Sequence, residues 1–353
     1  MQKLKIGVVG CGGIATVAHM PSYAKMDNVE IVALCDIIPE KAEKLAEDFG
    51  VKNTYTDFKK MIAEADIDAV DICTPNYLHS IIAVEAFKNG KHVFSEKPDA
   101  IDVEEARKMK DGAEAAGKTL MVMRNNRFAG ATQYAKKYIE DGEMGDVYAG
   151  RCGWIRRRGI PGKGGWFTTK AQSGGGPLID LGVHMIDVAI WLMGNPTPVA
   201  VSGAAFNKFA EDTSKADSEH ADFGEAKDGG TFDVEDLAMG FIKFDNGACL
   251  QIEFSWASNI EAEKTFVELR GSKAGLSWDN GYLKIFTEKD GQLVDEIPEI
   301  HEIYGGHEAN LRHFVDVILN GTDPCFKPIQ GFNMIKILTA IYESAKTGKE
   351  ISL

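Results

Sequence analysis

The stretch LKIGVVGCGGIA, residues 4–15, decides the fold of the first part of this chain. Its apolar beginning is typical of a buried parallel strand, and residues 16–26 have the pattern of a helix. Gly10, Gly12 and Ala15 have the spacing G-x-G-x-x-A, which combines a tight turn, close backbone approach to a pyrophosphate and close helix–strand packing. The stretch therefore predicts a dinucleotide-binding βαβ unit with phosphates at the helix N-terminus. The predicted contacts are Gly10, Gly12, Gly13 and Ile14.

An acidic residue stands where such a unit needs one. The second expected strand, residues 29–35, ends at Asp36, which lies 21 residues after Ala15. A carboxylate at this place binds the hydroxyls of the adenosine ribose. The next basic residue is Lys41, so no nearby cation is available for a ribose 2′-phosphate, and the carboxylate would repel one. We therefore expect NAD rather than NADP as the cofactor.

Strands and helices continue to alternate up to residue 124. Further strands are expected at 68–73, 92–95 and 119–123, and helices at 39–49, 78–88 and 103–116. This alternation predicts a doubly wound parallel sheet, which binds ligands at the carboxyl ends of its strands. Polar segments follow three strands, and we expect cofactor contacts from Thr74, Pro75, Asn76, His79, Glu96, Lys97, Pro98 and Asn125. Glu-Lys-Pro beside a nicotinamide points to a hydride-transfer enzyme.

Composition narrows the classes of partner. The 353 residues suffice for two domains, and 44% hydrophobic with 26% charged residues is ordinary for a globular protein. A net charge of -14 argues against nucleic acid or an anionic membrane, because phosphates would repel the protein. The six cysteines lack a C-x-x-C spacing, so neither a metal nor a disulfide framework is expected. Without a signal peptide or an apolar span, the expected location is the cytoplasm.

The pattern changes after residue 128. The longer strands that follow indicate a mostly antiparallel sheet. They are expected at 147–158, 199–206, 234–244, 248–256, 266–269 and 282–286, with helices at 131–140, 176–193, 308–319 and 329–346. Residues 211–230 are acidic and aperiodic, which predicts a solvated loop. We therefore expect an α/β Rossmann domain at 1–124 and, at 125–353, an α+β domain with a large open sheet for substrate binding and oligomerisation.

A second candidate site lies on the expected helix 176–193. Asp180 and His184 are four residues apart and share one face of a helix. A carboxylate beside an imidazole fixes its tautomer and supports a general base near neutral pH. A buried, structurally satisfied histidine remains the alternative interpretation of His184.

The order of these motifs resembles the glucose–fructose oxidoreductase / inositol dehydrogenase family (Gfo/Idh/MocA). The resemblance rests on the glycine fingerprint, Asp36, T-P-N-x-x-H at 74–79, E-K-P at 96–98 and D-x-G-x-H-x-x-D at 180–187, and it spans nearly the whole chain. It implies a Rossmann domain followed by a domain with a large, open, mostly antiparallel sheet. It also implies that Lys97, Asp180 and His184 are catalytic. Asp99 departs from the family pattern, because a small or apolar residue more often follows E-K-P.

The resulting hypothesis is reversible oxidation of a secondary alcohol on a sugar or cyclic polyol. In it His184, oriented by Asp180, removes the hydroxyl proton, and Lys97 stabilises charge on the same oxygen. Two alternatives from other classes remain: a redox-neutral glycosidase that uses NAD catalytically, and a non-catalytic protein that senses sugar or NAD.

Substrate contacts are expected from residues 154–167. Trp154, Arg156 and Arg158 alternate along a strand and share one face, and Trp166 follows in a glycine-rich loop. Two guanidiniums and an indole suit a polyhydroxylated ring. The alternative is a surface strand whose arginines pair with the protein's own carboxylates. In that case we expect substrate specificity to depend on Asn125, Arg127 and His79. The alternating second sheet also predicts self-association as a homodimer or homotetramer.

Overall fold

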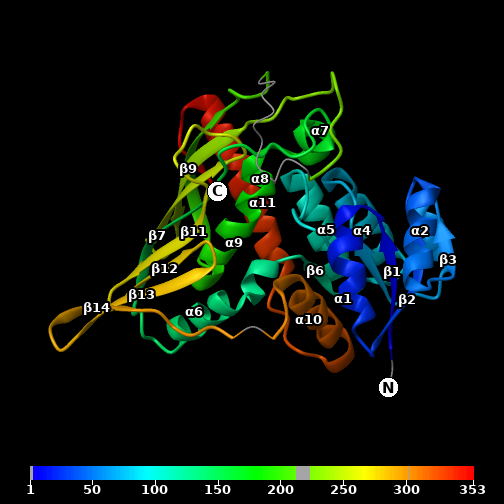
Figure 1. The fold of residues 1–353 in the computed structure, drawn as a ribbon, viewed down its shortest axis with the longest axis horizontal. Coiled ribbons are helices and arrows are strands. Elements are labelled where there is room, and N and C mark those ends of the chain that lie inside the picture. The colour runs from blue at the N-terminus through cyan, green and yellow to red at the C-terminus, as the bar shows by residue number, and fades with distance from the viewer. Residues whose placement is uncertain (1–2, 212–222, 302) are drawn as a thin grey trace. The chain divides into compact units, whose positions relative to one another are not determined.

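A computed structural model describes residues 3–211, 223–301 and 303–353 of this chain. The chain forms two compact units, drawn in Figure 1. The first comprises Met1–Asn125 and Tyr304–Ile335, and the second Asn126–Ile303 and Lys336–Leu353. A single division after residue 124 does not describe this grouping, because residues 304–335 pack with the first unit.

The first unit contains a parallel sheet of six strands in the order β3-β2-β1-β4-β5-β6. Its strands are β1 Leu4–Val9, β2 Val29–Cys35, β3 Asn53–Tyr55, β4 Ala69–Ile72, β5 His92–Ser95 and β6 Leu120–Val122. Its helices are α1 Met20–Ala24, α2 Pro39–Phe49, α3 Phe58–Glu64, α4 His79–Lys88, α5 Val103–Ala116 and α10 Gly306–Asn320. This arrangement confirms the predicted Rossmann fold. The short elements β3 and α3 were not predicted, since a strand of three mostly exposed residues and a helix of seven residues carry little periodicity.

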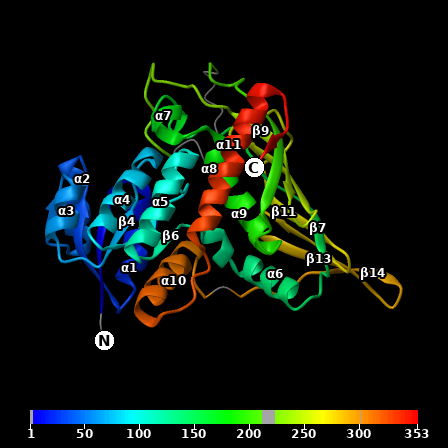
Figure 2. The same ribbon diagram turned by 180° about the vertical axis from the view of Figure 1, so that it is seen from behind.

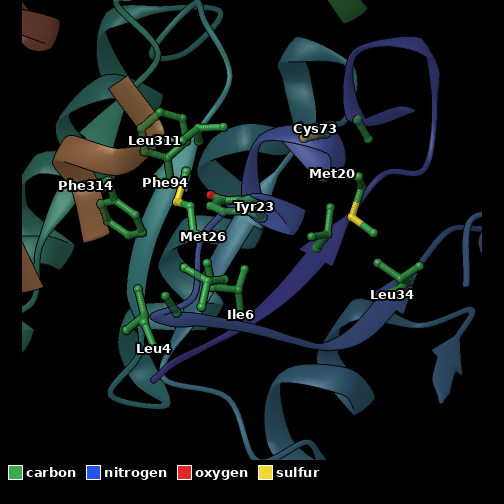
Figure 3. Close-up of a cluster of buried hydrophobic side chains, with 14 of the residues drawn as sticks. Leu4, Ile6, Met20, Tyr23, Met26, Leu34, Cys73, Phe94, Leu311 and Phe314 are labelled. Carbon is green, nitrogen blue, oxygen red and sulfur yellow. The ribbon is translucent and has the colours of Figure 1, made fainter. Parts of the chain in front are cut away.

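The core of the first unit joins distant parts of the chain (Figure 3). Leu311 and Phe314 of α10 are fully buried against residues of β1, α1 and β5. The rings of Phe94 on β5 and Phe314 meet edge to face, with centroids 5.2 Å apart. Burial of these side chains explains why α10 belongs to the first unit although it lies almost 200 residues after β6 in the sequence.

The second unit is built on nine strands in the order β14-β13-β12-β11-β7-β10-β9-β8-β15. Their bounds are β7 Val147–Ile155, β8 Pro198–Phe206, β9 Leu237–Phe244, β10 Cys249–Ser255, β11 Lys264–Gly271, β12 Gly275–Asp279, β13 Tyr282–Lys289, β14 Gln292–Glu296 and β15 Ile351–Ser352. Neighbouring strands are antiparallel except β7 and β10. The predicted large, mostly antiparallel sheet is confirmed.

Helices of the second unit are α6 Gly130–Glu140, α7 Lys170–Ser173, α8 Pro177–Asp180 and α9 Gly182–Leu192, and α11 Pro328–Thr347 ends in it. Helix α9 packs on β7, β10 and β11, along one face of the sheet (Figure 2). The predicted single helix 176–193 is wrong. The chain bends by 49° between residues 170–180 and 182–192. The break lies at Leu181, next to Gly182, where glycine weakens helix propensity.

Within the described ranges, no single helix is long and apolar enough to cross a membrane. Only the bent pair around Leu181 satisfies length and composition, and most residues of α9 are buried. Of the predicted loop 211–230, residues 212–222 lie outside the described residues.

Candidate active site

The turn after β1 has the geometry that the glycine fingerprint predicts. Gly10 has a φ of 95°, and a Cβ there would lie 2.5 Å from the carbonyl oxygen of Cys73. At Gly12 and Gly13, an added Cβ would meet no atom within 4 Å, so their outer side is open. The turn thus combines a position that only glycine tolerates with space above its backbone. Ile14 follows with helical backbone angles, directly before the π-helical turn Ala15–His19.

Asp36 is fixed at the end of β2 by two backbone groups. Its Oδ2 accepts a hydrogen bond of 2.8 Å from the N–H of Cys11, and its Oδ1 accepts one of 2.9 Å from Ile38. The first of these bonds ties the carboxylate to the glycine turn. Because each carboxylate oxygen has two lone pairs, Asp36 keeps acceptor capacity for ribose hydroxyls.

The loop after β4 contributes Thr74, Pro75 and Asn76 at the same edge of the sheet. The Thr74 hydroxyl is buried and has no hydrogen-bond partner, an arrangement that a bound polar group would satisfy. His79 is fully buried, with Nδ1 2.8 Å from the Pro98 carbonyl and Nε2 2.9 Å from the Thr74 carbonyl. Through these two hydrogen bonds its ring links the loops that follow β4 and β5. A direct contact of His79 with the cofactor stays a prediction. Asn125 follows β6.

These features fit NAD. The open side of Gly12 and Gly13 accommodates a pyrophosphate, Asp36 accepts hydrogen bonds from a ribose, and the Thr74 hydroxyl lacks a partner. No basic residue stands near Asp36 in the sequence before Lys41.

The segment after β5 carries Glu96, Lys97 and Pro98. Lys97 and Pro98 are joined by a cis peptide bond. The additional carboxylate of Asp99 forms a buried ion pair with Arg124, at 2.5 Å from Nη2 to Oδ2. The Arg124 guanidinium also lies over the ring of Phe326, 4.9 Å from its centroid. The carboxylate of Asp99 is thus paired with a buried cation of the same unit.

A histidine that sequence analysis missed joins this segment to β4. The ring of His19 is completely buried, with Nδ1 2.8 Å from Asp71 Oδ2 and Nε2 2.9 Å from Glu96 Oε1. His19 ends the π-helical turn Ala15–His19, directly after the fingerprint. The one signal in the sequence is Asp71, a carboxylate inside the otherwise apolar strand AVDI.

In the second unit, Asp180 and His184 lie on either side of the break at Leu181. Asp180 ends α8, and its Oδ2 accepts a hydrogen bond of 2.9 Å from the indole N–H of Trp256. His184 lies in the first turn of α9 and is half-buried, with its ring centroid 5.9 Å from that of Trp154. The argument from a shared face of one helix therefore does not apply, and the catalytic roles stay predictions.

Trp154 and Arg156 are found with this pair. The Arg156 guanidinium lies 5.1 Å from the centre of the Trp154 ring. Burial lowers the pKa of Arg156, although the charges of Asp180 and Glu263 oppose this effect. Arg156 donates from Nη1 to the Gly159 carbonyl, while its Nε has no hydrogen-bond partner. His184 thus lies beside an indole, and that indole lies beside a cation whose Nε has no hydrogen-bond partner.

Arg158 and Trp166 make other contacts. Arg158 donates to the carbonyls of Arg157 and Ser258, and its guanidinium lies 4.5 Å from the ring centre of Phe209. Trp166 stacks on Phe167 at a centroid distance of 3.8 Å.

Arg127 is also engaged inside the second unit. It forms a bidentate ion pair with Asp187, with Nε–Oδ2 and Nη2–Oδ1 distances of 2.6 and 2.7 Å. Both side chains are buried, and the guanidinium lies over Trp191. Asp187 is the last residue of the 180–187 motif, so this part of the motif is engaged in a buried ion pair within the second unit.

A cavity of about 350 Å³ opens beside Trp154. It is lined by Asn126, Trp154, Met185, Glu263, Lys264, Thr265, Trp278 and Asn280. Two indoles and several hydrogen-bonding side chains form its wall, a combination that suits a small ligand with an apolar face and hydroxyl groups. Apart from Trp154, its lining was not predicted, because these residues come from segments that meet only in the folded unit.

Comparison with known proteins gives a consistent result. Residues 4–124 match the oxidoreductase family model with an NAD-binding Rossmann fold, and residues 136–353 match the C-terminal alpha/beta domain of the same Gfo/Idh/MocA family. The chain is 34% identical to D-glucoside 3-dehydrogenase of Escherichia coli K12 over 99% of this chain and 97% of that protein. It is 32% identical to levoglucosan dehydrogenase of Pseudarthrobacter phenanthrenivorans over 98% and 97%. A solved levoglucosan dehydrogenase in complex with NADH and levoglucosan aligns with a TM-score of 0.87 at 26% identity, over 99% of both chains.

Proposed function

The chain belongs to the Gfo/Idh/MocA family of NAD-binding oxidoreductases, and from that premise we propose that it reversibly oxidises a secondary alcohol of a sugar or cyclic polyol. The observation that carries this proposal is the group of Asp180, His184, Trp154 and Arg156 in the second unit, which combines proton-transfer chemistry with groups that bind a hydroxylated ring.

His184 acts as the general base. Its imidazole is half-buried beside Trp154, so a substrate stacked on that indole can present a hydroxyl to it. Asp180, held by the indole N–H of Trp256, supplies the negative charge that favours the protonated imidazole formed in the reaction.

Lys97 of the first unit hydrogen-bonds the reacting oxygen and stabilises the negative charge that develops on it. Bound NAD supplies the hydride acceptor. The fingerprint turn and Asp36 bind the cofactor, with contributions from the loop at Thr74, from Glu96–Pro98 and from Asn125.

The cavity beside Trp154 supports a sugar as the substrate. Its volume of about 350 Å³ and its two indoles suit a pyranose-sized ring, whose C–H face packs on an aromatic plate. The names of the similar proteins, which act on a glucoside and on levoglucosan, support the same class. Arg156 is our main candidate for a donor to ring oxygens, because its Nε is unsatisfied.

The proposal is tested by incubating the protein with NAD and a panel of glucosides, anhydrosugars, hexoses, inositols and sugar acids. Accumulation of NADH with at least one compound is the expected result. Cleavage of a glycoside without net NADH would identify the redox-neutral alternative. Binding of a sugar or NAD without turnover of any compound would identify a sensor.

We also propose that the protein self-associates through its open sheet and works in the cytoplasm. On the strands at the β8 side, Phe206, Met239 and Phe241 keep 37–44% of their surface exposed in this chain alone. Adjacent exposed apolar residues on a sheet face favour burial against another copy. A monomer mass in light scattering at micromolar concentration would contradict the assembly. The six free cysteines agree with a reducing compartment.

A further inference from the structure

A buried charge network lies in the first unit outside the residues used above for proton transfer. Each ring nitrogen of His19 faces a carboxylate oxygen, of Asp71 on one side and of Glu96 on the other. A neutral imidazole has one N–H, so two carboxylate acceptors require the imidazolium form. Burial opposes that form, but the charge of Asp71 raises the pKa of His19 well above its usual value. His19 is therefore a fixed cation between two anions.

Three titratable groups next to this network stay uncharged near neutral pH, so they do not alter its charges. Burial raises the pKa of Cys73, which lies 3.4 Å from His19 Nδ1, to about 12, so it stays a thiol. Burial also raises the pKa of Tyr23, which faces Asp71 from α1. Burial lowers the pKa of His307 on α10, so this imidazole is neutral.

Glu96 connects the network to Lys97. Its Oε1 is held by His19, and its Oε2 accepts a hydrogen bond of 3.0 Å from the backbone N–H of Lys97. Burial alone would raise the pKa of Glu96, but the hydrogen bond and charge of His19 lower it to about 2. With both oxygens engaged, the carboxylate cannot turn without breaking one of the two contacts. The backbone of Lys97 is thus tied, through Glu96, to His19.

We propose that His19 is a positioning residue for the reaction: it holds Glu96, and Glu96 holds Lys97 at the place where it meets the reacting oxygen. The inference rests on the proposed role of Lys97. Turns of π-helix are rare in proteins, and many of those that occur lie at functional sites. The π-helical turn that ends at His19 therefore supports the positioning role.

A double-mutant cycle tests the proposal. His19→Gln should lower kcat about 10- to 100-fold, the usual consequence of a small misplacement of a catalytic group. Isothermal titration with NAD should show a much smaller change in Kd than in kcat, because the fingerprint turn and Asp36 still bind the cofactor. In a Lys97→Ala background, His19→Gln should cause almost no further loss, because the group that it positions is already gone. His92→Gln is the matched control, since His92 is a half-buried histidine at the other end of β5 and its Nδ1 accepts the Thr119 N–H. It should leave kcat unchanged.

The outcomes separate the two hypotheses. If Lys97→Ala alone leaves kcat unchanged, the proposed catalytic role of Lys97 is wrong. If Lys97→Ala is severe but His19→Gln lowers kcat by the same factor in both backgrounds, the positioning role of His19 is wrong. Should His19→Gln fail to fold, Glu96→Gln replaces it in the cycle, because an amide keeps only one of the two acceptor contacts.

A measurement on the protein without cofactor tests the charge of His19. A histidine whose pKa is raised in the folded state stabilises the fold fully below its unfolded pKa, about 6.5, and loses this contribution as pH rises toward the folded pKa. The difference in urea unfolding free energy between the native protein and His19→Gln should therefore shrink from about pH 7 to pH 9. In the native protein Glu96 stays ionised and His307 stays neutral over this range. A difference independent of pH would overturn the imidazolium assignment.

Discussion

His19 in the first unit and His184 in the second differ in how far their rings are buried. His19 has no exposed surface, and both of its nitrogens face carboxylates inside the protein. His184 is half-buried, with its ring against Trp154. A ring whose donors are all engaged internally holds a charge in place, whereas a ring with exposed surface can exchange a proton with a ligand. Burial thus separates a positioning histidine from a candidate base.

The largest expected effect tests the exposed member of this comparison. His184→Ala should lower kcat about 10²- to 10⁴-fold, the range for loss of a general base, with the Kd for NAD nearly unchanged. His301→Ala is a suitable control, because this side chain is 80% exposed. Steady-state kinetics at saturating NAD would measure both. A wild-type rate for His184→Ala would show that His184 is not the general base.

Lys97→Ala should lower kcat about 10²- to 10³-fold, because a group that stabilises developing charge on oxygen is lost. Lys91→Ala provides a matched control, since Lys91 precedes β5 and donates to the Ile67 carbonyl. Single-turnover measurements would separate the chemical step from product release. An effect on the KM for NAD alone would assign Lys97 to cofactor binding instead.

Asp36→Ala tests the cofactor half of the first unit and should raise the KM for NAD about 10- to 100-fold, the equivalent of one or two charged hydrogen bonds. The native protein should prefer NAD over NADP in kcat/KM, and the variant should lose most of that preference because the repulsive charge is gone. The carboxylate of Asp66 is exposed, with 86% of its side chain accessible. Asp66→Ala should therefore change neither the KM for NAD nor the preference for NAD over NADP. If the native protein prefers NADP, the assignment of NAD as the cofactor is wrong.

The smallest effect distinguishes two arginines of one segment. Arg156→Ala should raise the KM for the sugar about tenfold, since its buried guanidinium lies beside Trp154 with an unused donor. Arg158→Ala should change it less than about threefold, because this arginine is occupied by backbone carbonyls and Phe209. Initial rates over a range of sugar concentrations would show the difference. A larger effect at Arg158 would reverse the ranking.

Two strands that we did not predict could have been predicted from the turns beside them. The hairpins that join β12, β13 and β14 turn at Asn280-Gly281 and Asp290-Gly291, where all four residues have positive φ. Such pairs are the strongest short-range hairpin signal, and their use would have predicted both β12 and β14.

The sequence by itself determined the βαβ unit, the acidic residue for ribose and the sheet edge that carries Glu96 and Lys97. These features follow from periodicity and spacing over short stretches, and periodicity is a local property of the chain. It also placed Asp180 and His184 near each other in the chain, although it joined them wrongly in one helix.

Only the tertiary structure decided which polar groups are free for chemistry. His19 meets Glu96 across 77 residues of sequence, Arg127 meets Asp187 across 60, and Arg124 meets Asp99 across 25. No short-range pattern encodes these pairs. They form because burying a charge is unfavourable unless an opposite charge is buried with it, and the partner is chosen by how the strands and helices pack.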